Sequence, residues 1–235
     1  MADRYAVIGN PVAHSKSPWI HGEFARATGQ DIEYLRIEAP LDGFERTVEE
    51  FRAAHGRGAN VTLPFKEVAF RYCAEVTPRA RAAHAVNTLV FDGAGVRGDN
   101  TDGAGLLRDL TVNLGRVIRG QRILLMGAGG AARGVLGPLA GAGAAQIVIA
   151  NRTPAKAAEL VREFPGAPLE ACGYEELGDR AFDLVINATS AGLDGGMPAL
   201  PDGIFHPGAL AYELVYGRDT PFLALARAHG AATCD

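Results

Sequence analysis

Residues 122–132, Arg-Ile-Leu-Leu-Met-Gly-Ala-Gly-Gly-Ala-Ala, form the stretch of sequence that decides the fold. Residues 122–126, apolar after the first, predict a buried strand, and residues 131–142 predict the helix that follows it. Between the two, Gly127-Ala128-Gly129-Gly130-Ala131-Ala132 matches the G-x-G-x-x-G/A pattern of a dinucleotide-binding turn. In such a turn the N–H groups of a helix N-terminus meet a pyrophosphate, and side chains on the glycines would obstruct that approach. A glycine-rich turn in an alanine-rich chain is the alternative, and the strand–turn–helix order favours the dinucleotide.

The next strand indicates which dinucleotide would bind. Residues 147–150 predict a strand that ends in Asn151-Arg152-Thr153, and Lys156 follows one turn later. NAD sites usually carry an acidic residue here, to hold the ribose 2′-hydroxyl. A carboxylate is missing and two cations are present, which suits a 2′-phosphate. We therefore predict NADP(H), the alternative being that Arg152 and Lys156 belong to a solvated helix start.

Outward from this stretch, predicted strands and helices alternate along the whole chain. The predicted strands before residue 103 are 5–9, 34–38, 59–63 and 86–91, and the predicted helices are 17–29, 41–54 and 64–68. Later strands are predicted at 182–187 and 209–215, and later helices at 104–114, from Thr153-Pro154, and at 221–229. This alternation predicts an α/β fold with mainly parallel sheets in two domains, 1–103 and 104–235.

Composition and charge exclude several classes of protein. The net charge of −4 gives the chain no electrostatic reason to bind nucleic acid or an anionic membrane. No apolar run reaches the ~18 residues of a membrane span, and the chain enters a strand at once, without a secretory signal. Three dispersed cysteines without a C-x-x-C spacing indicate reduced thiols and no zinc site. We expect a soluble, cytoplasmic protein without a metal.

Lysine is scarce, which makes each lysine informative. The chain has 20 Arg and only 3 Lys, at positions 16, 66 and 156. Lys66 follows Pro64-Phe65 at a predicted helix start, where a cation opposes the helix dipole. Unlike arginine, lysine can release its proton. Asp102, at the predicted domain junction, is a candidate partner of Lys66, because clefts form at the junctions between α/β domains. The alternative is that its carboxylate only caps a turn.

Small polar residues gather in the first domain where folding alone does not require them. Ser15 and Ser17 lie in the loop after the first strand, Asn60 and Thr62 share one side of another strand, and Asn87 interrupts an apolar strand. Hydroxyls and carboxamides suit a polyol or a carboxylate ligand. Each residue alone could instead be a cap or a strand hydrogen bond, and we expect Ser17 to be a helix N-cap.

Taken together, these stretches resemble the motifs of shikimate dehydrogenases. The motifs of the first domain are Gly9-Asn10-Pro11-Val12-Ala13-His14-Ser15-Lys16-Ser17-Pro18, Gly58-Ala59-Asn60-Val61-Thr62-Leu63-Pro64-Phe65-Lys66, Ala85-Val86-Asn87-Thr88 and Gly98-Asp99-Asn100-Thr101-Asp102-Gly103. Those of the second are Gly127-Ala128-Gly129-Gly130-Ala131-Ala132-Arg133, Asn151-Arg152-Thr153 and Asn187-Ala188-Thr189-Ser190. They occur in the family's order along essentially the whole chain.

The resemblance implies reversible, NADPH-dependent reduction of 3-dehydroshikimate to shikimate, a step in aromatic amino-acid biosynthesis. It implies a substrate domain with the catalytic pair Lys66 and Asp102, and a Rossmann-type NADP-binding domain. Substrate contacts would come from Ser15, Ser17 and Tyr216 to the carboxylate, and from Thr62, Asn87, Lys66 and Asp102 to the ring oxygens. Cofactor contacts would come from Gly127, Ala128, Gly129, Gly130, Ala131, Asn151, Arg152, Thr153, Lys156 and, near the nicotinamide, Leu214. We expect a monomer or a homodimer.

One departure from the family and several alternatives stay open at this point. Family members continue past Cys234-Asp235 with a helix that returns to the first domain, and without it we expect weaker substrate binding and a looser domain interface. The Ser-x-Ser loop favours a shikimate specialist over a quinate/shikimate dehydrogenase of relaxed specificity. A silent NADP-binding protein is a further alternative, although retention of Lys66 and Asp102 speaks against it. The last alternative is an amino-acid or folate dehydrogenase of similar architecture.

Overall fold

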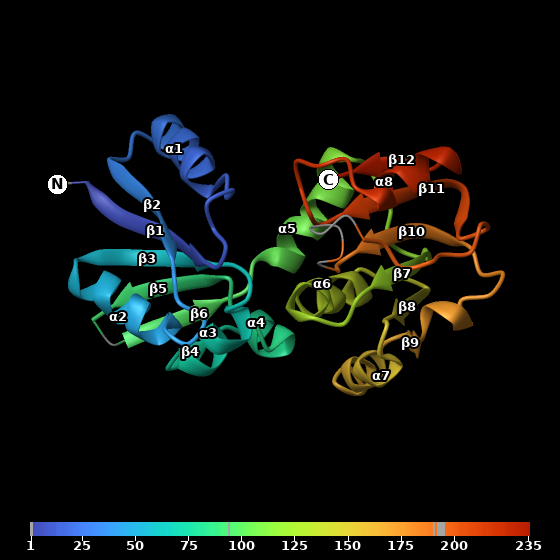
Figure 1. Cartoon of the computed structure of the whole chain (residues 1–235), viewed down its shortest axis with the longest axis horizontal. Helices are drawn as coiled ribbons and strands as arrows, with labels where there is room; N and C mark the ends of the chain where they lie inside the picture. The colour runs from blue at the N-terminus through green and yellow to red at the C-terminus, as the bar shows by residue number, and fades with distance from the viewer. Residues whose placement is uncertain (1, 94, 190, 192–195) are drawn as a thin grey trace. The chain divides into compact units, whose positions relative to one another are not determined.

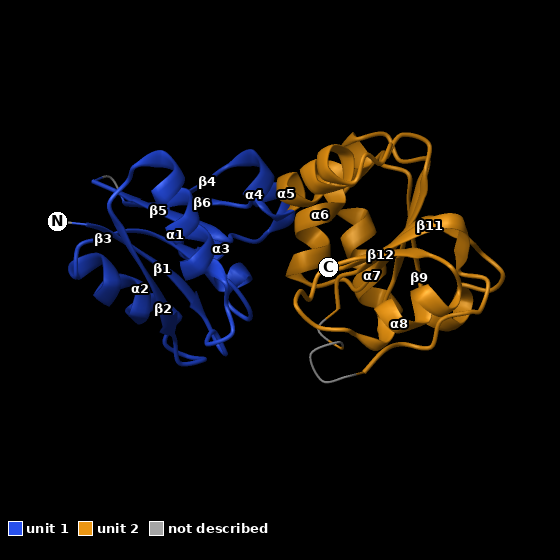
Figure 2. Ribbon diagram, turned by 90° about the horizontal axis from the view of Figure 1, so that it is seen from above, with its two compact units in different colours: residues 1–102 blue, residues 103–235 orange. Residues whose placement is uncertain are grey.

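The chain divides into two compact units, Met1–Asp102 and Gly103–Asp235 (Figure 2). The computed structural model describes residues 2–93, 95–189, 191 and 196–235, so Ser190 of the Asn187-Ala188-Thr189-Ser190 motif lies outside the described residues. Each unit is built on its own six-stranded, mainly parallel sheet with helices beside it (Figure 1). The predicted α/β fold class is confirmed.

Unit 1 contains six strands and four helices in its described residues. The strands are β1 (Asp3–Gly9), β2 (Ile32–Glu38), β3 (Gly56–Val61), β4 (Glu75–Val76), β5 (Thr88–Asp92) and β6 (Gly95–Asp99). The helices are α1 (Ser17–Thr28), α2 (Phe44–Ala53), α3 (Lys66–Tyr72) and α4 (Pro78–Ala83). The sheet order is β2-β1-β3-β5-β6-β4, in which β5 runs antiparallel to both of its neighbours. The remaining pairs are parallel, so the carboxyl ends of β1, β2 and β3 share one edge of the sheet.

Several boundaries in unit 1 differ from the prediction for identifiable reasons. Ser17 is not an N-cap: the backbone is already helical at Lys16, and the Ser17 N–H donates instead to Ser15 Oγ at 3.3 Å. Helix α2 begins at Phe44 because residues 40–43 form a turn closed by the Gly43 N–H and Pro40 O at 2.9 Å. Asn87 precedes β5 instead of lying in it, since its N–H donates to Asp99 O outside the strand ladder.

Unit 2 alternates strands and helices around β7 (Arg122–Met126), which has the predicted bounds. The other strands are β8 (Gln146–Ala150), β9 (Leu169–Cys172), β10 (Phe182–Asn187), β11 (Phe205–Glu213) and β12 (Ala232–Cys234). The helical segments are α5 (Asp102–Arg108, which begins at the last residue of unit 1), the π-helical η1 (Asp109–Asn113), α6 (Gly130–Gly141), α7 (Pro154–Arg162), the 3-10 segment η2 (Tyr174–Glu176) and α8 (Pro221–Ala228). The sheet order is β12-β11-β10-β7-β8-β9, and every pair is parallel.

Two hydrophobic clusters cover the two faces of the unit 2 sheet. Ile123 and Leu125 of β7 pack with residues of α6 and α7 on one face, while Leu124 and Met126 pack with residues of α8 on the other. All four are fully buried. Burial on both faces is what a central parallel strand requires, and it explains the uninterrupted apolar run in the sequence.

Among the residues that the structure describes, none of the helices is long and apolar enough to cross a membrane. The same residues contain no group of three or more His, Cys, Asp or Glu side chains placed to hold a metal ion.

Candidate active site

The two residues predicted as a catalytic pair meet in unit 1. Lys66 is the first residue of α3, and its Nζ donates to Asp102 Oδ2 at 2.6 Å. The two side chains are 18% and 25% exposed, so the pair is partly shielded from water yet open to a ligand. A partly shielded ammonium–carboxylate pair places a proton donor and a fixed positive charge at one point.

Asn87 ties the second carboxylate oxygen of Asp102 in place. Its Nδ2 donates to Asp102 Oδ1 at 2.7 Å, while its Oδ1 accepts the Thr101 N–H at 3.0 Å. The backbone adds a further link, because the Val86 N–H donates to Lys66 O at 2.9 Å. Asp102 is therefore held on both oxygens, and three separate segments of the chain meet at this point.

Asn60 connects this cluster to the end of the site near α1. Its Nδ2 donates to Asn87 O and to Thr88 Oγ1, both at 3.3 Å, and its Oδ1 accepts the hydroxyl of Tyr34. The His21 ring stacks on Tyr34 with centroids 4.3 Å apart. Burial raises the pKa of Tyr34 and lowers that of His21, so both side chains are neutral near pH 7. The sequence reasoning missed Tyr34 and His21, since neither stands in a recognisable motif.

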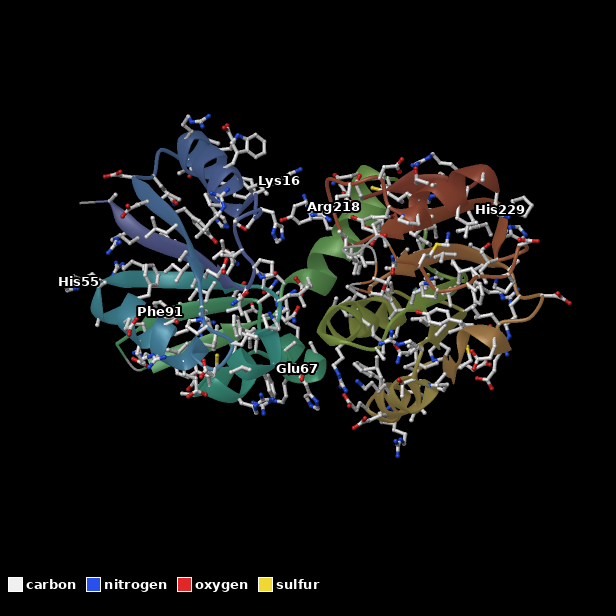
Figure 3. The ribbon with its side chains drawn as sticks, in the orientation of Figure 1. Lys16, His55, Glu67, Phe91, Arg218 and His229 are labelled. Atoms are coloured by element: carbon white, nitrogen blue, oxygen red, sulfur yellow. The ribbon has the colours of Figure 1, made fainter. Side chains whose placement is uncertain are left out.

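The two serines of the first loop lie together at the carboxyl edge of the unit 1 sheet. Ser15 is buried, and its Oγ donates to Ser17 Oγ at 3.1 Å. The Arg36 guanidinium fixes this loop through bonds of 2.8 and 2.6 Å to Ser15 O, a role that no motif in the sequence indicates. Figure 3 labels Lys16, between the serines, and His55, at the other edge of the same sheet. Two adjacent hydroxyls near a guanidinium suit a carboxylate ligand.

Thr62 lies at the same edge, one residue beyond the end of β3. Its N–H donates to Ile8 O at 2.9 Å, and its half-buried side chain packs close to Gly9, where an added Cβ would lie 2.3 Å from Thr62 Cγ2. The expectation that Asn60 and Thr62 share one strand is wrong, because β3 ends at Val61.

The backbone that carries Asp102 is itself held by neighbouring side chains. Asn100 is 3% exposed, donates from Nδ2 to Ala85 O at 3.0 Å and accepts the Asp102 N–H at 3.1 Å. Asp99 accepts from Thr77 Oγ1 at 2.6 Å and from Arg79 Nε at 2.7 Å. The hydrogen bond from Arg79, aided by Thr77, lowers the pKa of Asp99 to about 2.

In unit 2 the glycine turn has the geometry that a pyrophosphate needs. Gly127 has a φ of +102°, and a Cβ there would lie 3.1 Å from Ala188 O, so only glycine fits without strain. A Cβ on Gly129, the N-cap of α6, would meet nothing within 4 Å, which leaves the approach to the helix end open. The first N–H groups of α6 have no partners within the helix and are available to an anion. These residues fit a dinucleotide pyrophosphate.

The end of β8 carries the predicted cations and no carboxylate. Arg152, Thr153 and Lys156 are exposed, and Asn151 Nδ2 donates to Thr153 O at 2.9 Å, which shapes the turn into α7. Arg152 also lies close enough to Tyr174 to lower the pKa of its hydroxyl, although burial outweighs this and raises that pKa to about 12. An exposed guanidinium near a half-buried aromatic residue, with an exposed ammonium one turn further along the chain, suits a 2′-phosphate.

The last two predicted residues lie after β11. Leu214 is half-buried and packs against the hydrophobic cluster that includes residues of α6, and its N–H donates to Asn187 O at 3.1 Å. Tyr216 is 47% exposed in unit 2. Ser15 and Ser17, its predicted companions at the substrate carboxylate, belong to unit 1.

Unit 2 has a Rossmann-type sheet in which two cations follow the second strand, and the same chain carries a paired lysine and aspartate. Together these features define a dinucleotide-dependent oxidoreductase. Family models support this class: the shikimate dehydrogenase substrate binding domain matches residues 7–89, and shikimate / quinate 5-dehydrogenase matches residues 110–193. A protein named Shikimate dehydrogenase (NADP(+)) from Dechloromonas aromatica is 56% identical over all of this chain and 86% of its own length. The chain belongs to the shikimate dehydrogenase family.

Two solved structures share the fold of this chain over nearly its whole length. An Ael1 enzyme from Pseudomonas putida is 48% identical, with a TM-score of 0.90 over 99% of this chain and 87% of that one. Shikimate 5-dehydrogenase from Thermus thermophilus, in complex with NADP(H) and shikimate, is 36% identical, with a TM-score of 0.87 over 99% and 86%.

Proposed function

We propose that this protein is a shikimate dehydrogenase that reduces 3-dehydroshikimate to shikimate with NADPH, reversibly, in the pathway to chorismate and the aromatic amino acids. The observation that carries the proposal is the contact of Lys66 Nζ with Asp102 Oδ2 at 2.6 Å, with Asn87 on the other carboxylate oxygen. The pair stands in a chain whose relatives are named Shikimate dehydrogenase (NADP(+)).

We assign the substrate to residues 1–103 and NADP(H) to residues 104–235. The match of residues 7–89 to a substrate binding domain supports the first assignment, and the glycine turn at the start of α6 supports the second. In the substrate domain, Ser15 and Ser17 would hold the carboxylate, and Thr62 and Asn87 would hold ring hydroxyls.

In the second domain, the N–H groups at the start of α6 would hold the pyrophosphate. The residues assigned to the turn are Gly127, Ala128, Gly129, Gly130 and Ala131. Asn151, Arg152, Thr153 and Lys156 would hold the adenosine end with its 2′-phosphate, and Leu214 would face the nicotinamide. NADPH, when bound, supplies the hydride.

The chemistry of the pair follows from charge. As the carbonyl carbon gains a hydride, its oxygen becomes negative, and the Lys66 ammonium stabilises that charge and donates the proton that completes the hydroxyl. Asp102 orients the ammonium through Oδ2 and is itself oriented by Asn87 through Oδ1. In the oxidation direction Lys66 takes the same proton back.

The test is the loss of NADPH absorbance when 3-dehydroshikimate is added to the purified chain. We expect loss with NADPH and a much slower reaction with NADH. Quinate with NADP⁺ is the control for the second candidate, a quinate/shikimate dehydrogenase, which the adjacent Ser15 and Ser17 hydroxyls do not favour. Binding of NADPH without turnover would instead identify a silent NADP-binding protein and end the enzymatic proposal.

We further propose that the protein works in the reducing cytoplasm as a monomer or homodimer. Cys73, Cys172 and Cys234 are all free thiols. Burial raises the pKa of the Cys73 thiol to about 11, which keeps it protonated and unreactive. Light scattering on the purified protein distinguishes monomer from homodimer.

A further inference from the structure

The proposed function leaves one buried carboxylate of unit 2 unused. Glu213, the last residue of β11, is 1% exposed, and its neighbours Asn187 and Thr220 are each 2% exposed. Glu213 pairs in register with Asn187 of β10, which pairs in turn with Met126, the residue before Gly127. The carboxylate therefore lies at the edge of the sheet that carries the glycine turn.

Three neutral donors satisfy this carboxylate. Oε1 accepts the Val215 N–H at 3.1 Å, and Oε2 accepts Asn187 Nδ2 at 2.8 Å and Thr220 Oγ1 at 2.9 Å. Within the part of the chain that the structure describes, no cation forms an ion pair with it. A buried carboxylate without a cation costs stability compared with an apolar residue, so its presence here points to a role in arranging its donors.

Asn187 connects the Glu213 carboxylate to the loop that packs against the glycine turn. Because Asn187 Nδ2 faces Glu213, its Oδ1 faces the next loop and accepts the Thr189 N–H at 3.1 Å and the Thr189 hydroxyl at 2.8 Å. Ala188 O in that loop forms the wall against Gly127. Glu213 thus fixes two loops at once, residues 188–189 after β10 and residues 214–215 after β11.

The sheet order indicates what these loops face. In the order β12-β11-β10-β7-β8-β9, the pyrophosphate turn follows β7 and the cations for the 2′-phosphate follow β8. A dinucleotide lies across the carboxyl ends of such a sheet, so its other half extends over β10 and β11. Building on the proposed function, we propose that Glu213 is a positioning residue for the nicotinamide half of NADPH.

The variant Glu213→Gln tests this role in the full chain. The side chain keeps its size, but one oxygen becomes an NH2 that must face a donor. We expect the Kd for NADPH to rise at least tenfold, whereas the Kd for adenosine 2′,5′-bisphosphate, which lacks the nicotinamide half, changes less than twofold. The matched control is Asp183→Asn in β10, whose carboxylate accepts the Arg122 N–H at 2.8 Å at the opposite edge of the sheet, and both affinities should persist there.

An equal rise in the Kd for both ligands, or no rise in either Kd, would overturn the proposal. If Glu213→Gln does not fold, Glu213→Asp keeps the charge but withdraws both oxygens by one methylene, and it should give the same selective loss. These binding measurements are independent of turnover. Wild-type protein that binds NADPH but does not reduce 3-dehydroshikimate would therefore contradict the proposed function and leave the assignment of Glu213 intact.

Discussion

Asp102 divides its two oxygens between partners of different charge. Oδ2 accepts from the Lys66 ammonium and Oδ1 from the neutral amide of Asn87. The carboxylate can therefore neither rotate nor move without losing one of them. The chemistry proposed for Lys66 depends on this constraint, because an ammonium on a flexible stem needs a fixed partner to stay at one point.

Asp102→Asn tests the constraint. The carboxamide keeps the shape, but its NH2 must face either the Lys66 ammonium or the Asn87 amide, and both are donors. We expect kcat to fall by about 10²–10⁴-fold, the usual worth of a positioned acid–base group, while the melting temperature and the Kd for NADPH change little. Steady-state kinetics with calorimetry check this, and near-full turnover would show that Asp102 is not needed.

Arg152 is expected to determine the choice of dinucleotide. Arg152→Ala removes an exposed guanidinium at the end of β8, where a 2′-phosphate would lie. We expect the KM for NADPH to rise at least tenfold and the KM for NADH to stay unchanged. Arg162→Ala, in the last turn of α7, the helix that follows Arg152, is the control and should alter neither value.

At the scale of elements, the turn between β7 and α6 separates two requirements for glycine. At Gly127 the requirement is folding, because φ is positive and Ala188 O lies against the position of a Cβ. At Gly129 φ is −89° and the surrounding space is open, so the requirement there would come from a ligand. One turn thus contains a glycine that the fold requires and a glycine that is proposed to serve ligand binding.

Substitution by alanine should separate these two requirements. We expect Gly127→Ala to lower the free energy of unfolding by about 1–3 kcal/mol, from backbone strain and crowding. Gly129→Ala should change it by less than about 0.5 kcal/mol yet weaken NADPH binding at least tenfold. Urea unfolding and NADPH titration check both, and a stable Gly127→Ala protein would contradict the first expectation.

The segment that leads from β6 to Asp102 depends on an ionised Asp99. Its pKa is lowered from 3.8 to about 2, chiefly by the hydrogen bond from Arg79. A lowered pKa in the folded state adds stability that is complete above about pH 4 and is lost as pH falls toward 2. Because Arg79 is half exposed, we expect a contribution of about 1–2 kcal/mol at pH 7.

Comparison with Asp99→Asn measures this contribution. The variant should unfold more easily than the wild type at pH 7, and the difference should narrow between pH 4 and pH 3. Asp31→Asn, an exposed carboxylate of the same unit, serves as the control. A difference in unfolding free energy that is constant with pH would show that the Arg79 interaction does not stabilise the folded state.

Strands that are buried on both faces were predicted more accurately than the other strands. The bounds of β7 and β10 were predicted because both strands are apolar over most of their length and buried on both sides. Strands β6 and β9 were not predicted, since glycine or charge interrupts their apolar residues and their pairing depends on neighbours distant in sequence. Register and hairpin formation at such strands are set by tertiary contacts that local pattern does not contain.

At the scale of the whole molecule, each unit has its own sheet and its own buried clusters. The proposed division of labour therefore predicts that each ligand protects its own unit. In hydrogen exchange, NADP⁺ alone should slow exchange at residues 130–133, and shikimate alone should slow exchange at residues 62–66 and 100–102. Protection by shikimate confined to unit 2 would contradict the assignment of the substrate domain.

The sequence predicted the centre of the site better than its surroundings. Lys66 and Asp102 were identified because a lysine at a helix start and a carboxylate at a junction are unusual for folding alone, and because they stand in family motifs. The structure brings these two side chains together, and whether any of the predicted residues contacts a ligand stays a prediction. Tyr34, His21 and Glu213 gave no signal, since a tyrosine in a strand, a histidine in a helix and an acidic residue at a strand end are all common. Only the folded chain brings their partners together.

The scarcity of lysine, together with the enclosure of Lys66, has a consequence for chemical labelling. Lys16 and Lys156 are exposed, whereas the Lys66 side chain is 18% exposed and its Nζ is held by Asp102. An acylating reagent at limiting concentration therefore modifies the two exposed side-chain amines first and leaves the third for last. Because the chain has only three lysines, the order of modification, followed by mass, reports how tightly the Lys66 nitrogen of the proposed catalytic pair is enclosed.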